Sequence, residues 1–209
     1  MLVDEIVRRV RERSTRLASG LPVPAVPVGS DFQMNGLVPT TGTYRAASVL
    51  VPIVNRGSEI TILLTQRTED MPSHAGQVAF PGGRRQEDDA DAVATALRET
   101  EEEVGLDRQF VEVIGSYDHY RTGTSYEITP IVGIVTPGFT IRADPREVAD
   151  VFEVPLGHFL DEKNHRIDSR MAQGRERRFY AMPYGQRYIW GATAGMLKNL
   201  AFILTEGGL

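Results

Sequence analysis

The 209-residue sequence contains no cysteine, so disulfide bonds and metal sites built from thiolates are excluded. It also lacks a hydrophobic run long enough to cross a membrane, which needs roughly 18 apolar residues in succession. The longest apolar stretch, at 47–54, has the length of a buried strand. The glycine-lysine pattern of a phosphate-binding P-loop does not occur either. The sequence therefore predicts neither a membrane protein nor a P-loop nucleotide hydrolase.

The composition is that of an ordinary globular protein, with 41% hydrophobic and 24% charged residues. The net charge of −5 gives no reason to expect a nucleic-acid partner. At 1–10, charged residues interrupt the apolar positions, unlike the continuous apolar core of a signal peptide. We therefore expect a cytoplasmic protein that acts on a small molecule and does not bind membranes.

Two segments of different character divide the sequence. Apolar residues recur at helical spacing over 3–18, prolines alternate with apolar residues over 21–28, and 29–44 is rich in turn residues. We predict that residues 1–44 form an N-terminal helix and an extended proline-rich arm, and that 45–209 form the main domain. The N-terminal arm (1–44) has two interpretations, a segment packed on its own domain or an element that joins two copies in a homodimer.

The main domain mixes strand and helix patterns. Apolar runs at 47–54 and 59–65 flank a turn signal and predict a hairpin. Further strands are expected at 111–117, 127–136 and 178–190, and helices at 88–104 and 191–204. Because no βαβ unit repeats, these elements predict an α/β (α+β) fold, a mixed β-sheet sandwiched between helices.

Four glutamates occupy five successive positions at 99–103. On a helix that turns about 100° per residue, Glu99, Glu102 and Glu103 fall on one side, whereas Glu101 points elsewhere. Like charges one turn apart repel one another. The residues expected to face the core are Val93, Leu97, Thr100 and Val104. Three carboxylates are thus expected to converge away from that face.

This acidic side has two interpretations, a solvated surface balanced by nearby arginines or a site for a divalent cation. Carboxylate oxygens suit Mg²⁺ or Mn²⁺. Ala92 and Ala96 share the glutamate side and leave room above it. Gly82 and Gly83 allow close backbone approach to a ligand, and Arg98 can clamp one glutamate through a two-point ion pair.

At this point the sequence resembles a known family. The matching residues are Gly83 followed by Arg98-Glu99-x-x-Glu102-Glu103-x-Gly105-Leu106. They resemble the signature of the Nudix hydrolases, which cleave a nucleoside diphosphate linked to another group. At the midway position, where the family has a glutamate, only Asp88 or Asp89 is available. The resemblance implies an enzyme with the Nudix-type mixed sheet between helices.

A second signature lies upstream, in the stretch Leu63-Leu64-Thr65-Gln66-Arg67 and onward to Phe80-Pro81-Gly82-Gly83. It resembles the coenzyme A diphosphatase branch of the family. Coenzyme A or acyl-coenzyme A cleaved to 3′,5′-ADP and (acyl-)4′-phosphopantetheine is then the first substrate hypothesis. Pro72 stands where this branch has a basic residue, so ADP-ribose or NADH remains an alternative substrate. A third hypothesis is a nucleotide-ligand sensor that keeps the fold without catalysis.

The resemblance also implies roles for individual residues. Glu99 and Glu103 are expected to bind Mg²⁺ or Mn²⁺, with Glu102 and the Gly83 carbonyl as further ligands. These cations are the only cofactors that the resemblance implies.

The base that activates water is expected to be Glu102, with Glu147 as the second choice. Arg98 is expected to orient a catalytic carboxylate. The candidate contacts to substrate phosphates, each of which is as readily a surface charge, are Arg67, Arg84 and Arg45.

Overall fold

A computed structural model of the protein describes residues 1–36, 43–71, 74–172 and 174–207. Its helices are α1 (Val3–Ala18), α2 (Ala92–Val104), α3 (Leu156–Leu160) and α4 (Ala192–Phe202), joined by the short turns η1 (Gln33–Asn35), η2 (Arg108–Phe110), η3 (Glu162–Asn164) and η4 (Ile203–Gly207). Its strands are β1 (Arg45–Asn55), β2 (Ile60–Arg67), β3 (Val78–Ala79), β4 (Gly82–Arg84), β5 (Val111–Ser116), β6 (Tyr120–Arg121), β7 (Tyr126–Val135), β8 (Val148–Pro155), β9 (Arg166–Ala172) and β10 (Arg175–Ala181).

Eight of the strands form one mixed sheet around β1. The main order is β3-β2-β1-β7-β5, with β4, β6 and β8 pairing with β1, β7 and β2. The central pair β1–β7 is parallel, and the other pairs are antiparallel. Strand β1 is buried over most of its length, which explains its continuous apolar sequence. This architecture confirms the predicted α/β fold.

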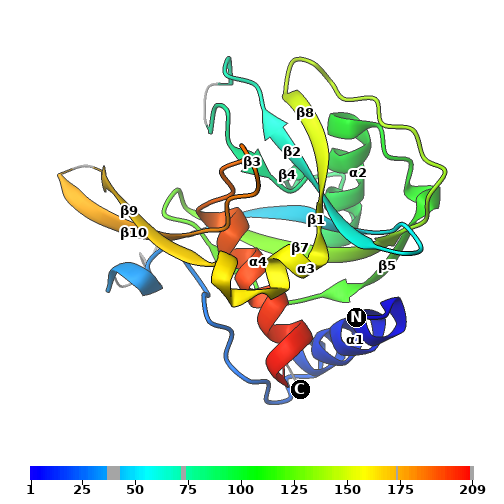
Figure 1. The fold of residues 1–209 in the computed structure, drawn as a ribbon, viewed down its shortest axis with the longest axis horizontal. Helices are drawn as coiled ribbons and strands as arrows, with labels where there is room; N and C mark the ends of the chain where they lie inside the picture. Colours follow the sequence, from blue (N-terminus) through cyan, green and yellow to red (C-terminus); the bar gives the residue numbers. More distant parts are fainter. Residues whose placement is uncertain (37–42, 72–73, 173, 208–209) are drawn as a thin grey trace.

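Helices cover both faces of the sheet, as Figure 1 shows. On one face, α2 packs against a core that contains Leu50, Leu63 and Ile131. On the other face, α1, α3 and α4 enclose a larger core that contains Val51 and Leu64. Successive β1 residues therefore serve opposite cores, as the alternation of side chains along a strand requires. The layers place α2 and its glutamates at one face only.

Several predicted boundaries need correction. Helix α2 begins at Ala92 rather than at 88, because the Asp91 carboxylate accepts from the Ala94 N–H at 2.8 Å and caps the helix. The strand predicted at 178–190 ends at Ala181, since Pro183 lacks a backbone donor. Strands β8 and β9 were not expected. No helix in the four described ranges is long and apolar enough to cross a membrane.

The N-terminal arm lies against the main domain. Arg13 is buried and forms an ion pair of 2.7 Å with Asp118, just after β5. Farther along, Asn199 of α4 makes reciprocal hydrogen bonds with the backbone of Val28, at 3.0 and 2.6 Å. The arm is thus packed on its own domain, as the first interpretation expected. Residues 37–42 lie outside the described part of the chain.

Contact between α1 and β5 depends on the absence of a side chain at Gly115. Its φ is +146°, and a Cβ atom there would lie 2.8 Å from the Cβ of Ser14. We predict that Gly115→Ala lowers the free energy of unfolding by about 1–3 kcal/mol, because the backbone is strained and α1 is displaced. Urea denaturation measures this change.

The matched control is Gly157→Ala on α3, where an added Cβ meets no atom within 4 Å. Equal stability of the two variants would contradict this account of α1 docking.

Candidate functional site

The buried carboxylate of Glu103 is the centre of the candidate site. It lies in the last turn of α2 with only 5% of the residue exposed. Its Oε2 accepts from the Gly82 N–H at 3.0 Å, and its Oε1 lies 3.6 Å from Nη1 of Arg67. Burial, followed by the nearby charges of Glu99 and Glu147, raises the pKa of Glu103 to about 7. The site therefore holds a negative charge at a cost that a cation would relieve.

The two glycines before α2 allow the backbone to fit between the sheet and the helix. Gly82 has φ +151°, and a Cβ there would lie 2.4 Å from the carbonyl oxygen of Ser48 on β1. A Cβ on Gly83 would lie 2.6 Å from the carboxylate carbon of Glu99. Only glycine brings the backbone this close to both neighbours. The Gly82–Gly83 turn is thus in direct contact with two of the predicted metal ligands.

Arg98 connects the start of the site to the glutamates. Its guanidinium makes a two-point ion pair with Asp89, at 2.8 and 2.9 Å, rather than with a glutamate as expected. It also lies 2.9 Å from Glu102 and 3.0 Å from Glu99. Asp89 is buried, whereas Asp88 is exposed. Asp89 therefore occupies the midway position of the signature, an assignment that the sequence left open between the two aspartates.

The pKa of Asp89 is lowered, first by the hydrogen bonds from Arg98 and then by the backbone N–H of Gln86. The Thr95 hydroxyl donates a further hydrogen bond to its Oδ2 at 3.0 Å. These donors keep Asp89 ionised, so its pair with Arg98 persists at neutral pH. The contribution of Thr95 was not anticipated, since nothing in its spacing singles it out.

The expected convergence of three carboxylates differs from the structure. Glu102 is exposed and turns toward Arg98, while Glu99 and Glu103 lie against the Gly82–Gly83 turn. Ala96 is fully buried, so the glutamate side does not face away from the core as predicted. In the part of the chain that the structure describes, no three histidine, aspartate or glutamate side chains are arranged to hold a metal ion.

The loop that carries Glu147 is held beside the end of α2. The Asp144 N–H donates to the Glu103 carbonyl at 2.9 Å, and the Thr68 N–H donates to the Glu147 carbonyl at 3.0 Å. The charge of Glu147 contributes to the raised pKa of both Glu99 and Glu103. The structure thus places Glu147 close enough to Glu99 and Glu103 for their charges to interact, although the two segments are distant in the sequence.

The three candidate arginines differ in their surroundings. Arg67 lies beside Glu103, and its buried Nε has no hydrogen-bond partner among the described residues. Arg84 is exposed on β4, next to Gly83. Arg45 lies over the ring of Tyr126 at 4.1 Å and donates to the Thr124 carbonyl at 3.1 Å. Only Arg67 therefore contacts the buried carboxylate directly. Pro72 lies outside the described residues.

The residues present fit a hard divalent cation. Burial raises the pKa of Glu99 as well as that of Glu103, so the two carboxylates share a partly desolvated region. The backbone of Gly83 also lies close to the Glu99 carboxylate. Oxygen donors of this kind are those that Mg²⁺ and Mn²⁺ prefer.

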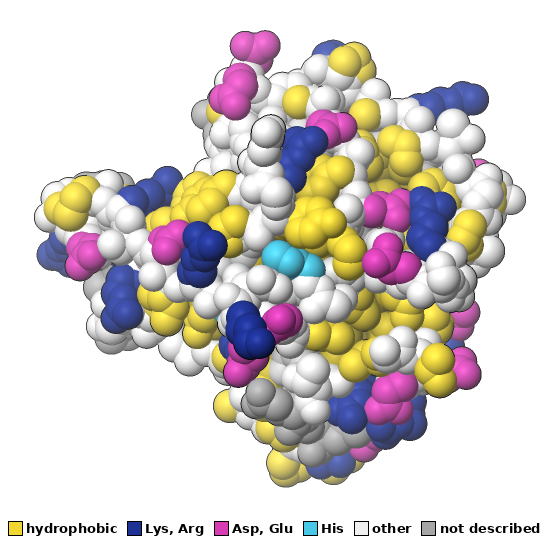
Figure 2. Space-filling view, viewed as in Figure 1, with side chains coloured by type: hydrophobic (Ala, Val, Ile, Leu, Met, Phe, Trp, Pro, Cys, Tyr) yellow, Lys and Arg dark blue, Asp and Glu magenta, His cyan; other side chains and the backbone are white. Residues whose placement is uncertain are grey.

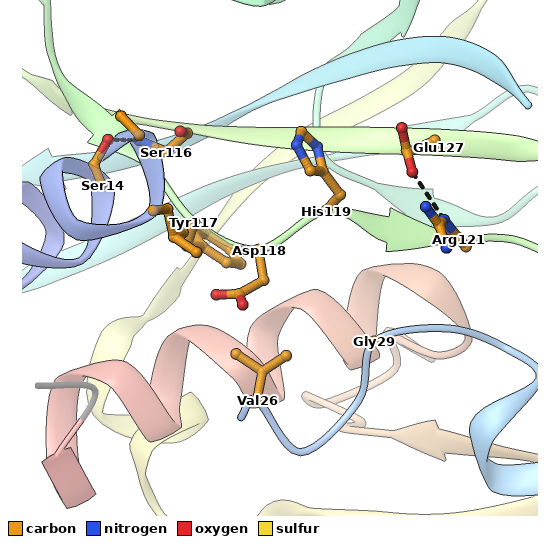
Figure 3. Close-up of a pocket in the computed structure, with 11 residues that line it drawn as sticks. Ser14, Val26, Gly29, Ser116, Tyr117, Asp118, His119, Arg121 and Glu127 are labelled. Carbon is orange, nitrogen blue, oxygen red and sulfur yellow. Dashed lines mark hydrogen bonds and ion pairs between the residues drawn. The ribbon is translucent and has the colours of Figure 1, made fainter. Parts of the chain in front are cut away.

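A separate pocket of about 560 Å³ lies between the N-terminal arm and the segment from β5 to β7 (Figure 3). Its acidic side chains are Asp118 and Glu127, and its one arginine, Arg121, is paired with Glu127 at 2.8 Å. Asp118 is paired with Arg13. The charges of this pocket are therefore compensated internally, and it offers no unpaired cation to a phosphate.

Comparison with known proteins shows which family the chain resembles. Residues 44–173 match the family described as the NUDIX domain. The chain is 44% identical over 161 residues to NudL of Escherichia coli (strain K12 / DH10B), a Nudix hydrolase described as uncharacterized; the match covers 77% of this chain and 83% of that protein. NudL of Photorhabdus laumondii is 43% identical over 157 residues, covering 75% and 83%.

Among solved structures, the chain is similar to an Ap4A hydrolase of C. elegans. The TM-score is 0.47 and the identity 18%, and the match covers 53% of this chain and 80% of that one.

The Asp89–Arg98 pair gives a test of how the site is held. We predict that Asp89→Asn weakens Mn²⁺ binding by roughly 10- to 100-fold, because Arg98 loses the partner that fixes it beside Glu99. Isothermal titration calorimetry with Mn²⁺ measures the change. Asp88→Asn is the matched control, since it makes the same chemical change at an exposed neighbour. Similar Mn²⁺ affinities for both variants would show that the Asp89 pair does not support the site.

Proposed function

The chain belongs to the Nudix family, and from this membership we propose that it hydrolyses a diphosphate bond between a nucleoside and another group, with Mg²⁺ or Mn²⁺. The observation that carries the proposal is the buried Glu103 carboxylate, placed with Glu99 against the Gly82–Gly83 turn. We further propose that residues 45–209 form the catalytic domain and that the N-terminal arm covers one of its faces.

Glu99 and Glu103 would hold the divalent cation, with the Gly83 carbonyl and Glu102 as further ligands. A cation bound there would neutralise the anionic diphosphate and acidify a bound water. Arg98 would act by position, since its contacts to Glu99 and Glu102 limit where these carboxylates can point. The raised pKa of Glu103 supports this assignment, because an uncompensated carboxylate at this depth is partly protonated at neutral pH.

A carboxylate oxygen must accept the proton of the attacking water. Glu102 and Glu147 are the two candidates. Glu102 is exposed and forms an ion pair of 2.9 Å with Arg98. Glu147 lies close enough to Glu99 and Glu103 for its charge to raise the pKa of both, which supports a role at the reacting phosphate. We propose that one of these two carboxylates is the base.

Arg67 would contact a substrate phosphate. Its side chain is 20% exposed beside Glu103, so its guanidinium would offer a charge-assisted hydrogen bond to an incoming oxygen. Arg84 and Arg45 remain secondary candidates for such contacts. Arg84 has the better position, because it follows Gly83 directly on β4.

Coenzyme A or an acyl-coenzyme A is our preferred substrate, with 3′,5′-ADP and (acyl-)4′-phosphopantetheine as products. The upstream signature in 63–83 supports this choice. Pro72, which replaces a basic residue of that signature, favours the alternative of ADP-ribose or NADH. Binding without turnover would identify the third possibility, a nucleotide-ligand sensor.

The first prediction concerns the metal ligands. Glu103→Gln should reduce turnover by about a thousandfold, because it removes a charge worth several kcal/mol to the charge-stabilised transition state. Steady-state rates at saturating Mg²⁺ measure this loss, and circular dichroism confirms that the variant is folded.

Glu101→Gln is its matched control on the same helix. Glu101 pairs with Arg108 rather than with the site, so this variant should keep its rate. Near-wild-type turnover of Glu103→Gln would disprove the ligand assignment.

The second prediction concerns substrate choice. Chromatography of reactions with coenzyme A, ADP-ribose and NADH, each with Mg²⁺ and Mn²⁺, should show coenzyme A as the best substrate. Pro72→Arg should raise kcat/KM for coenzyme A by roughly tenfold, since the guanidinium supplies a charged hydrogen-bond donor to a substrate phosphate. Pro72→Gln controls for loss of the proline alone. Preference for ADP-ribose or NADH in every variant would select the alternative.

A further inference from the structure

The hairpin of β9 and β10 stands apart from the eight-stranded sheet and projects from the body of the molecule (Figure 1). Ile167 and Met171 of β9 are 49% and 71% exposed. Figure 2 shows hydrophobic side chains where the hairpin meets the body, with Lys and Arg side chains around them. The hairpin is thus an exposed, partly apolar element that has no role in the proposed hydrolysis.

The two outer edges of the hairpin differ in their hydrogen bonding. The edge of β10 is covered at Arg178, whose N–H donates to Asn35 Oδ1 at 2.7 Å and whose carbonyl accepts from Asn35 Nδ2 at 3.1 Å. Asn35 belongs to η1 of the N-terminal arm. Arg178 therefore directs its backbone groups away from β9.

The orientation of Arg178 fixes that of β9. Arg178 is paired with Ser169, so the backbone groups of Ser169 also point away from the hairpin. Because the direction of the backbone groups repeats every second residue, the N–H and C=O groups of Ile167 and Met171 also point away from β10. Among the described residues, these three have no hydrogen-bond partner for their outward N–H and C=O groups. Strand β9 is therefore an unpaired edge of three donors and three acceptors.

The sequence of β9 is self-complementary about Ser169. In an antiparallel pair of two such strands centred there, Ile167 lies opposite Met171 of the other copy, and Asp168 lies opposite Arg170. Both charged side chains are held on one hairpin face, since Asp168 accepts from the Tyr188 hydroxyl at 2.6 Å and Arg170 lies over Trp190 at 4.4 Å. Within the described residues, neither is in an ion pair.

The two nearest registers, centred on residues 168 and 170, are disfavoured by charge. Only registers that shift by whole pleats keep the outward groups of Ile167, Ser169 and Met171 in contact with the second copy. Centring the pair on residue 168 places Asp168 opposite itself, and centring it on 170 does the same for Arg170. Like charges directly opposite each other are destabilising. Charge thus favours the register centred on Ser169 over its two nearest neighbours, and this register also pairs the most outward groups of β9.

We propose that β9 pairs with β9 of a second copy of this chain, antiparallel about Ser169, so that two hairpins form one four-stranded sheet. The interface is isologous, because each strand offers the same residues to the other. Pairing of one strand from each copy buries less area than the roughly 1,200–2,000 Å² of a standard interface. The dimer is therefore weak and dissociates on dilution. This dimer does not depend on the proposed hydrolysis.

Charge reversal tests the register. In sedimentation velocity over a concentration series, the full-length chain should move from monomer to dimer. Arg170→Glu should weaken dimerisation by roughly tenfold or more, since both cross-strand pairs become repulsive. The double variant Asp168→Arg/Arg170→Glu restores opposite charges and should restore the dimer. Lys163→Glu, with the same change in charge on η3, should dimerise as the wild type does.

Hydrogen exchange tests whether β9 is the contact. The amides of Ile167, Ser169 and Met171 should gain protection as concentration rises, whereas those of Asp168 and Arg170 are bonded to β10 at all concentrations. A wild type that stays monomeric throughout the series overturns the proposal. A dimer whose three outward amides stay unprotected, or one that Arg170→Glu leaves intact, overturns it as well.

Discussion

The hydrogen bond between the Gly82 N–H and the buried Glu103 carboxylate is the contact on which the candidate site depends. It joins the end of α2 to Gly82 at the start of β4, a strand that pairs with β1 in the sheet. A carboxylate at this depth is tolerated only where donors or cations compensate its charge. The Gly82 N–H and the nearby Arg67 meet part of that requirement, whereas Glu147 adds a like charge that raises the pKa of Glu103.

Arg98 organises the other side of the same helix. By pairing with Asp89, it links the segment before α2 to the second turn of the helix, and its remaining donors reach two glutamates. A planar guanidinium presents five donors in a fixed fork, so it can pair with several carboxylates at once. The acidic run is therefore both a candidate cation site and part of an internal ion-pair network. The arginine pairing of the first interpretation is observed, and the cation site of the second stays a proposal.

Much of this arrangement could be predicted from local patterns. The strand pattern around β1, the helix end at Gly105 and the signature residues all carry short-range signals, and the fold followed from them. The direction of Glu102 could not be predicted, because it depends on which partner Arg98 takes. Nor could β9, since most of its residues are exposed and show no apolar period. Contacts between distant segments, such as that of the Glu147 loop with α2, leave no periodic trace in the sequence.

The reciprocal hydrogen bonds between Val28 and Asn199 have a consequence for how the protein reaches its native state. They join residues 171 positions apart, so the Val28 segment reaches its final place only after α4 has formed. Contacts over such a separation form slowly compared with local contacts. Until they form, the side chain of Val28, which is buried in the native protein, is exposed to water, and apolar surface exposed in this way leaves a partly folded chain open to aggregation.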